Sequence, residues 1–296
     1  MSEAPDDGRV KLCQNPFIQF PMPIAKSLLR DAQCKRIFLG ALALLLTLPA
    51  PRALAHDFWI EPLKFRVTKG EKVPLQLLVG QEFKGNAALY NPEQFERYVY
   101  TGLGGERPVV GELGDDPAGT VAISGPGLYV VGFYSKKFDV TFNTFQEFEP
   151  YLIKEGLERN LTLARKRSGV RGGILELYTR CAKSLIASAQ ADAGQADYVF
   201  GFPLELVAET NPYKQKDLQL RLLYRGQPLE GALVVAFNKA DPLTKLKART
   251  DHAGRVIFKL PRAGVWLVTS VHQIPTSLFA RADWESFWAS LTFERP

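Results

Sequence analysis

Histidine is scarce in residues 56–296, and one of its three copies has an unusual position. His56 directly follows Ala53-Leu54-Ala55, a small-residue motif typical of signal-peptidase cleavage. After cleavage there, His56 would carry the free α-amine, whose ordinary pKa of about 7.7–8.0 lies well below that of lysine. An amine and an imidazole on one residue form a bidentate nitrogen pair that suits copper, nickel or zinc. His56 is therefore a candidate metal ligand, and the alternative is that the residue after a cleavage site is arbitrary.

The other two histidines differ in their surroundings. His272 ends an apolar run that predicts a strand, and a third nitrogen from it would complete a histidine brace with His56. Taken alone, His272 is typical of a structural histidine. His252 lies in a predicted turn, so we interpret it as a surface residue. Asp57 and Glu61 are possible carboxylate partners near the predicted new terminus.

A secretory signal precedes His56. Lys35 and Arg36 stand before the apolar run Ile37–Leu48, which ends at a proline. A helix of that length spans roughly 18 Å, too short for a hydrocarbon core of ~30 Å, although a short membrane anchor is the alternative. We predict that residues 1–55 are a removed leader and signal peptide. The mature protein is then periplasmic or secreted, with no membrane span.

Charge and motifs exclude several classes of function. The chain is 46% hydrophobic and 23% charged, and residues 56–296 hold 30 Lys and Arg against 27 Asp and Glu. This formal charge of +3 gives no electrostatic case for nucleic acid. A nucleophile elbow, a phosphate loop, a dinucleotide fingerprint and an HExxH motif are all missing, which weakens hydrolase, kinase and dehydrogenase hypotheses. No catalytic or cofactor-binding residue is nominated, and the question of enzyme activity stays open.

The elements that would position these residues are mainly strands. Short β-rich runs separated by Gly and Pro turns predict a first antiparallel sandwich over 56–143. Helical spacing of apolar residues then predicts two helices and a polar linker over 144–196, with the second helix opening at Gly172-Gly173 and running from Ile174 to Ile186. Strands resume over 197–296 as a second sandwich. The predicted fold class is mainly β, with two Ig-like or transthyretin-like sandwiches and a helical insertion between them.

Several side chains receive separate interpretations. Cys181 is the only cysteine after residue 55, so no intramolecular disulfide is possible in the mature chain, and we interpret it as a buried thiol. Arg180 and Lys183 would share one face of the second helix and either pair internally or bind an acidic partner. The basic run at 165–171 is interpreted as a solvated loop, with an anion site as the alternative. Trp59, Trp284 and Trp288 are either core residues or stacking rings for a carbohydrate.

Several motifs together resemble one bacterial family. They include Ala55-His56-Asp57-Phe58-Trp59-Ile60-Glu61-Pro62, Gly125-Pro126-Gly127-Leu128-Tyr129, Pro203-Leu204-Glu205-Leu206-Val207, Asn211-Pro212-Tyr213, Val271-His272 and the run 282–293. The chain resembles the domain-of-unknown-function family DUF4198, which is grouped with NikM-like nickel-uptake accessory proteins. The resemblance implies a periplasmic or secreted β-rich protein with nickel or cobalt handling. The family's histidine positions match His56 and His272.

Three functions follow from these observations. The first is an exported protein that binds a divalent transition metal (Ni, Co or Cu) through His56 and His272, for uptake or for delivery to a membrane metal transporter. The second is a carbohydrate- or protein-binding β-sandwich module without metal. The third is a histidine-brace copper oxidase, which would need an open axial position at the copper.

Overall fold

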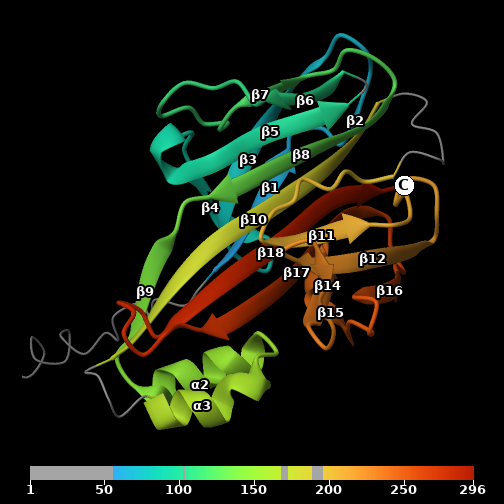
Figure 1. Ribbon diagram of the computed structural model, residues 1–296. Helices are drawn as coiled ribbons and strands as arrows, with labels where there is room; N and C mark the ends of the chain where they lie inside the picture. The colour runs from blue at the N-terminus through green and yellow to red at the C-terminus, as the bar shows by residue number, and fades with distance from the viewer. Residues whose placement is uncertain (1–55, 103, 168–172, 189–195) are drawn as a thin grey trace, which may run out of the picture. The chain divides into compact units, whose positions relative to one another are not determined.

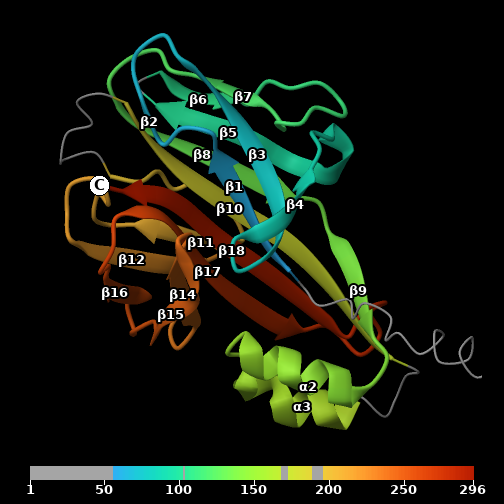
Figure 2. The ribbon, with the colours of Figure 1, turned by 180° about the vertical axis from the view of Figure 1, so that it is seen from behind.

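The long strand β10 (Ile174–Ser188) organises the fold. The computed structural model describes residues 56–102, 104–167, 173–188 and 196–296. The predicted leader and signal, the cleavage motif and most of the predicted linker lie outside these residues. In Figures 1 and 2, β10 can be followed as the yellow arrow that runs through a large sheet.

A ten-stranded sheet contains β10. It pairs in parallel with β18, and this pair joins strands from the N-terminal part of the chain to strands from the C-terminal part. The sheet runs in the order β15 (Asp241–Arg249), β14 (Leu233–Asn238), β17 (Gly264–Pro275), β18 (Trp284–Arg295), β10, β8 (Gly127–Ser135), β5 (Phe95–Gly102) and β6 (Gly105–Pro108). Two further strands pair with β10: β2 (Arg66–Val67) and β9 (Phe138–Phe142).

Two smaller sheets complete the β structure. The first has the order β1 (Asp57–Pro62), β3 (Lys72–Gln81) and β4 (Lys84–Ala88), with β7 (Thr120–Ala122) also on β3. The second has the order β11 (Leu204–Ala208), β12 (Asp217–Tyr224) and β13 (Gln227–Pro228), with β16 (Arg255–Lys259) also on β12. The predicted hairpin turn after β12 is confirmed, since Arg225 and Gly226 both adopt positive φ, as a tight two-residue turn requires.

The two small sheets bury two different apolar cores against the ten-stranded sheet. One core contains Ile60 and Leu75 of the β1 sheet with Ala182 and Ile186 of β10. The other contains Leu206 and Leu220 of the β11 sheet with Cys181 and Leu185 of β10. Because successive side chains of a strand point to opposite faces, these cores lie on opposite sides of β10. Cys181 is free and buried, as predicted, and burial raises the pKa of its thiol to about 12.

The helices differ in position from those that the sequence predicts. The first predicted helix is confirmed as α2 (Phe145–Lys154), which Thr144 caps by accepting from the backbone N–H of Glu147. A short 3-10 turn, η3 (Glu158–Asn160), leads into α3 (Leu161–Arg167), and another, η2 (Pro92–Gln94), precedes β5. The basic run therefore lies on a helix up to Arg167 rather than in a loop, and Arg171 lies outside the described residues.

The second predicted helix is wrong, because Ile174 to Ile186 form most of β10. Apolar residues in this segment do not alternate, since both faces of the strand are covered by a core. A strand buried on both faces has no period of two, and its apolar run then matches helical spacing by chance.

The described residues between His56 and Pro296 form one compact unit. The predicted bounds at 143/144 and 196/197 stay a prediction, since the two cores divide by face of the central sheet rather than by position along the chain. Within the residues that the structure describes, no helix has the length and apolar character needed to cross a membrane.

Candidate functional site

His56 stands at the free end of β1. Its side chain is exposed, whereas Phe58, Trp59 and Ile60, which follow it, are buried and fix the strand. The residue lines an open surface pocket of about 590 Å³ together with six residues at the adjoining ends of β3 and β4: Val79, Gly80, Gln81, Lys84, Gly85 and Asn86. The pKa of the imidazole is lowered by partial burial first, and then by Lys154 and Arg180.

Asp57, which follows His56, interacts with a second part-buried carboxyl group, that of Glu155. Burial raises the pKa of Asp57, Glu82 raises it further, and Lys154 and Lys245 oppose the shift. Burial raises the pKa of Glu155 to about 7, and Asp57 contributes to that rise despite Lys154, whose Nζ lies 3.3 Å from the Glu155 carboxylate. This end of the molecule thus holds carboxyl groups that desolvation disfavours as anions, and a cation bound there would reverse that penalty.

His272 has a different environment on β17. The side chain is buried, its ring centre lies 4.4 Å from that of Tyr224, and Nη2 of Arg159 lies 2.7 Å from its Nδ1. Because a guanidinium only donates, Nδ1 accepts and the neutral ring carries its proton on Nε2. Burial, and then Arg159 and Arg225, lower the pKa of His272 to about 4. Cations and an aromatic ring therefore surround this imidazole.

His56 and His272 share no neighbour among the contacts of the described residues. Among those residues, no three His, Cys, Asp or Glu side chains form a group able to hold a metal ion. The pairing of His56 with His272 at a metal stays a prediction. His252 is exposed in its turn, as predicted. Glu61 pairs with Lys239 and accepts from the indole of Trp59, so it is engaged elsewhere.

The three tryptophans nominated as stacking rings are core residues. Trp59 and Trp284 are fully buried, and Trp288 is only 7% exposed. This favours the core interpretation and removes the rings on which the carbohydrate-binding alternative depended.

Glu176 is a buried carboxyl group on the face of β10 that also carries Ala182 and Ile186. Glu176 accepts from the Tyr151 hydroxyl at 2.8 Å, from the Gln273 amide at 2.7 Å and from the Ser286 hydroxyl. Burial raises its pKa to about 7, against the effect of these hydrogen bonds. The side chain is inaccessible and fully partnered, so we assign it a structural role.

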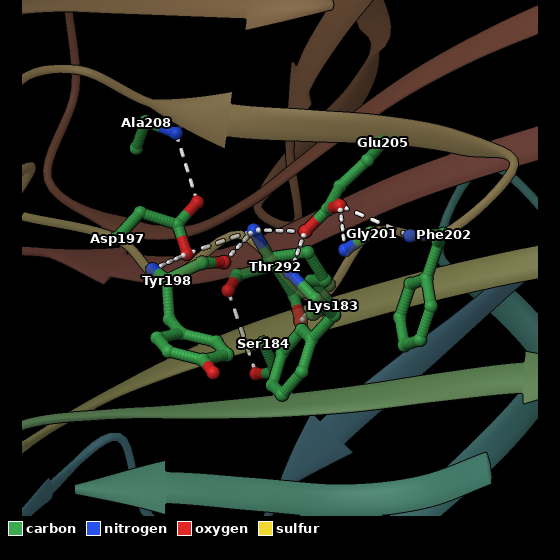
Figure 3. Close-up of polar contacts among 10 residues, drawn as sticks. Lys183, Ser184, Asp197, Tyr198, Gly201, Phe202, Glu205, Ala208 and Thr292 are labelled. Carbon is green, nitrogen blue, oxygen red and sulfur yellow. Dashed lines mark hydrogen bonds and ion pairs between the residues drawn. The ribbon is translucent and has the colours of Figure 1, made fainter. Parts of the chain in front are cut away.

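A second buried ionic group lies on the other face of β10 (Figure 3). Nζ of Lys183 lies 2.9 Å from Oδ1 of Asp197 and 3.1 Å from Oε1 of Glu205, and it donates to the Tyr198 carbonyl at 2.7 Å. The three charged side chains are at most 1% exposed. The predicted internal pairing is thus confirmed for Lys183.

Arg180 follows a different pattern. Its guanidinium carbon lies 5.0 Å from the ring centre of Phe58 and 5.4 Å from those of Phe138 and Tyr178. Burial lowers its pKa. No ion pair of Arg180 is found among the described residues, so internal charge pairing is not seen for it. A strand, unlike the predicted helix, sends Arg180 and Lys183 to opposite faces.

The fold defines a mainly β protein in which two small sheets pack on a shared larger one. The chain belongs to the family described as a domain of unknown function (DUF4198), which matches residues 53–274. No curated protein matches it.

Three solved structures show weak similarity. The D0-D1 domain of intimin is 10% identical, with a TM-score of 0.17, over 80% of this chain and 97% of that one. A tetra-tandem repeat from the extending region of a large adhesion protein is 11% identical, with a TM-score of 0.19, over 81% and 49%. A Salmonella alpha-2-macroglobulin mutant is 13% identical, with a TM-score of 0.19, over 83% and 16%.

Proposed function

We propose that the protein is exported to the periplasm or beyond and binds a divalent transition-metal ion (Ni, Co or Cu) at a mature N-terminal His56, for uptake or delivery. The metal is cargo in this proposal, not a resident cofactor. A membrane metal transporter is the partner that such a carrier would serve. The resemblance to a family that is grouped with NikM-like accessory proteins supports the same proposal.

The position of His56 is the observation that carries the proposal. It is the exposed residue directly before a strand whose next residues are buried, so a terminal amine there would be held beside the pocket at the ends of β3 and β4. Amine and imidazole nitrogens on one residue are ligands that copper and nickel accept.

The fit of the predicted second ligand is poorer. Nδ1 of His272 already accepts from Arg159, and both nearby charges are positive. A metal could bind this ring only if Arg159 moved and the ring changed its tautomer. We therefore place the first ligands on His56 alone and leave the contribution of His272 to a variant.

The test compares two proteins that differ by one residue. One begins at His56 and the other retains Ala55, which turns the α-amine of His56 into a peptide nitrogen. Both are titrated with Ni(II), Co(II), Cu(II) and Zn(II) by calorimetry. We expect one-to-one binding of one of these ions by the first protein, and at least about tenfold weaker binding by the second, which is a loss of about 1.4 kcal/mol.

Two substitutions in the shorter protein complete the design. His272→Ala shows whether the second histidine takes part, and His252→Ala is the matched control for loss of an exposed imidazole. Equal affinity with and without Ala55 would contradict the amine–imidazole site. Binding lost only in His272→Ala would move the site to β17.

A further inference from the structure

The group formed by Lys183, Asp197 and Glu205 has the geometry of a reaction between an amine and a carboxylic acid. The Lys183 amine touches an oxygen of Asp197, and the carboxyl carbon lies one bond beyond that oxygen. A second carboxyl group, that of Glu205, touches the same nitrogen from another side. Figure 3 shows the two carboxyl groups converging on the amine from different segments of the chain.

The surroundings exclude water. All three side chains are essentially inaccessible, and the Phe200 ring centre lies 5.8 Å from the Lys183 amine. The Tyr198 carbonyl fixes the direction of the amine by accepting from it. Holding two reactants at contact distance in a dry site supplies a large part of the barrier reduction for a condensation that water otherwise disfavours.

The two carboxyl groups differ in what holds them. Glu205 accepts from three backbone N–H groups, those of Phe200, Gly201 and Phe202. Asp197 accepts from two backbone N–H groups, those of Tyr198 and Ala208. Burial raises the pKa of Asp197, which favours its neutral acid form. Asp197 is therefore the electrophile and Glu205 the proton carrier.

We propose that Lys183 and Asp197 are joined by an intramolecular amide bond, formed in the folded protein with Glu205 as its catalytic residue. A proton passes from the Lys183 ammonium to Asp197, which gives a neutral amine and a neutral acid. The amine nitrogen then attacks the Asp197 carboxyl carbon. Glu205 takes a proton from that nitrogen and returns it to the departing hydroxyl group. One C–N bond forms, one C–O bond breaks, and one water leaves, so no other reactant is needed.

The product keeps its hydrogen bonds. The amide nitrogen retains one hydrogen, which can still be donated to the Tyr198 carbonyl, and the remaining Asp197 oxygen can still accept from Ala208. The bond would tie the segment entering β11 covalently to β10. This inference is independent of metal binding at His56.

The test is a mass measurement on the purified, folded chain. The sequence from Cys181 to Lys214 contains Lys183 as its only internal trypsin site. After denaturation and digestion, we expect an uncut 181–214 peptide that is lighter than its sequence by one water. An unlinked chain would give a cut after Lys183 and no loss of mass, and that result from folded protein would overturn the proposal.

Two variants separate this bond from other losses of water. In Asp197→Asn the same amide forms by loss of ammonia, so its linked peptide has the same mass as the wild-type one. In Glu205→Gln both partners remain but the proton carrier is gone, so we expect the full mass and cleavage at Lys183. Glu230→Gln, an exposed position, is the control and stays linked. Wild-type mass decides the question even if a variant fails to fold.

Discussion

Strand β10 carries two cations three residues apart, and its two faces treat them in opposite ways. Lys183 is surrounded by two carboxylates and a carbonyl at hydrogen-bond distance. Arg180, on the opposite face, packs among three aromatic rings. Its charge acts on His56 and lowers the pKa of that imidazole. A buried charge is tolerated only when it is paired and hydrogen-bonded, or when its flat guanidinium can stack on rings.

The difference separates two kinds of site. The Lys183 group is complete in itself, with each charge partnered and no access from solvent, and this suits a permanent structural or covalent role. The His56 end is open and holds carboxyl groups next to surplus cations, and this suits a reversible ligand. Single substitutions can therefore disturb one face of β10 and leave the other intact.

The largest effect is expected from Lys183→Met. The variant keeps the volume but removes the partner of Asp197 and Glu205, whether an amide bond or an ion pair joins them to Lys183, and leaves both carboxyl groups buried without it. Removing one partner of a buried ionic group costs about 3–5 kcal/mol of the free energy of unfolding. Urea unfolding followed by circular dichroism measures this loss.

The control for Lys183→Met is Arg66→Met, which removes a pair with Glu294 in which both side chains are at least one-third exposed. Such pairs contribute under about 1 kcal/mol. Equal losses in the two variants would mean that burial of the Lys183 group has no energetic consequence.

A smaller and pH-dependent effect is expected from Glu176→Gln. The folded state raises the pKa of Glu176 from 4.5 to about 7, so it binds this proton more tightly than the unfolded chain does. Wild-type stability is therefore lost as pH rises from about 4.5 through 7, by about 3 kcal/mol for this group. Glutamine cannot ionise, so the free energy of unfolding of the variant should rise relative to that of wild type as the pH increases across that range.

Unfolding free energies at pH 4, 5.5, 7 and 8 measure this difference. Glu112→Gln, at an exposed position, serves as the control and should change little at any pH. A difference between Glu176→Gln and wild type that is constant with pH would show that Glu176 is ionised at no cost in the fold.

Sequence patterns predicted most strands, but not the one that organises them. Runs such as 73–79 and 218–224 alternate because one of their faces is buried more deeply than the other. β10 is buried on both faces, so its apolar residues do not alternate and their spacing matches that of a helix. The Lys183 group joins residues far apart in sequence, and Asp197 follows a segment that reads as a polar linker. Its one local signal was Glu205, a carboxylate between two buried leucines of a strand.

The smallest effect concerns metal affinity at the His56 end. Arg180 and Lys154 are the charges that lower the pKa of His56, and a metal ion there would meet the same repulsion. Charges several ångströms apart near solvent interact by roughly 0.5 kcal/mol, so Arg180→Met should tighten binding by about twofold. Calorimetric titration of the protein that begins at His56 measures this change.

The matched control for Arg180→Met is Arg225→Met, because Arg225 acts on His272 and not on His56. If His56 binds the metal alone, Arg225→Met leaves the affinity unchanged while Arg180→Met raises it. If both histidines hold the ion, both substitutions raise the affinity. Weaker binding in Arg180→Met would instead mean that packing of the guanidinium against its three rings is needed to hold β1 in place. The His56 end would then depend on packing as much as the Lys183 group depends on charge.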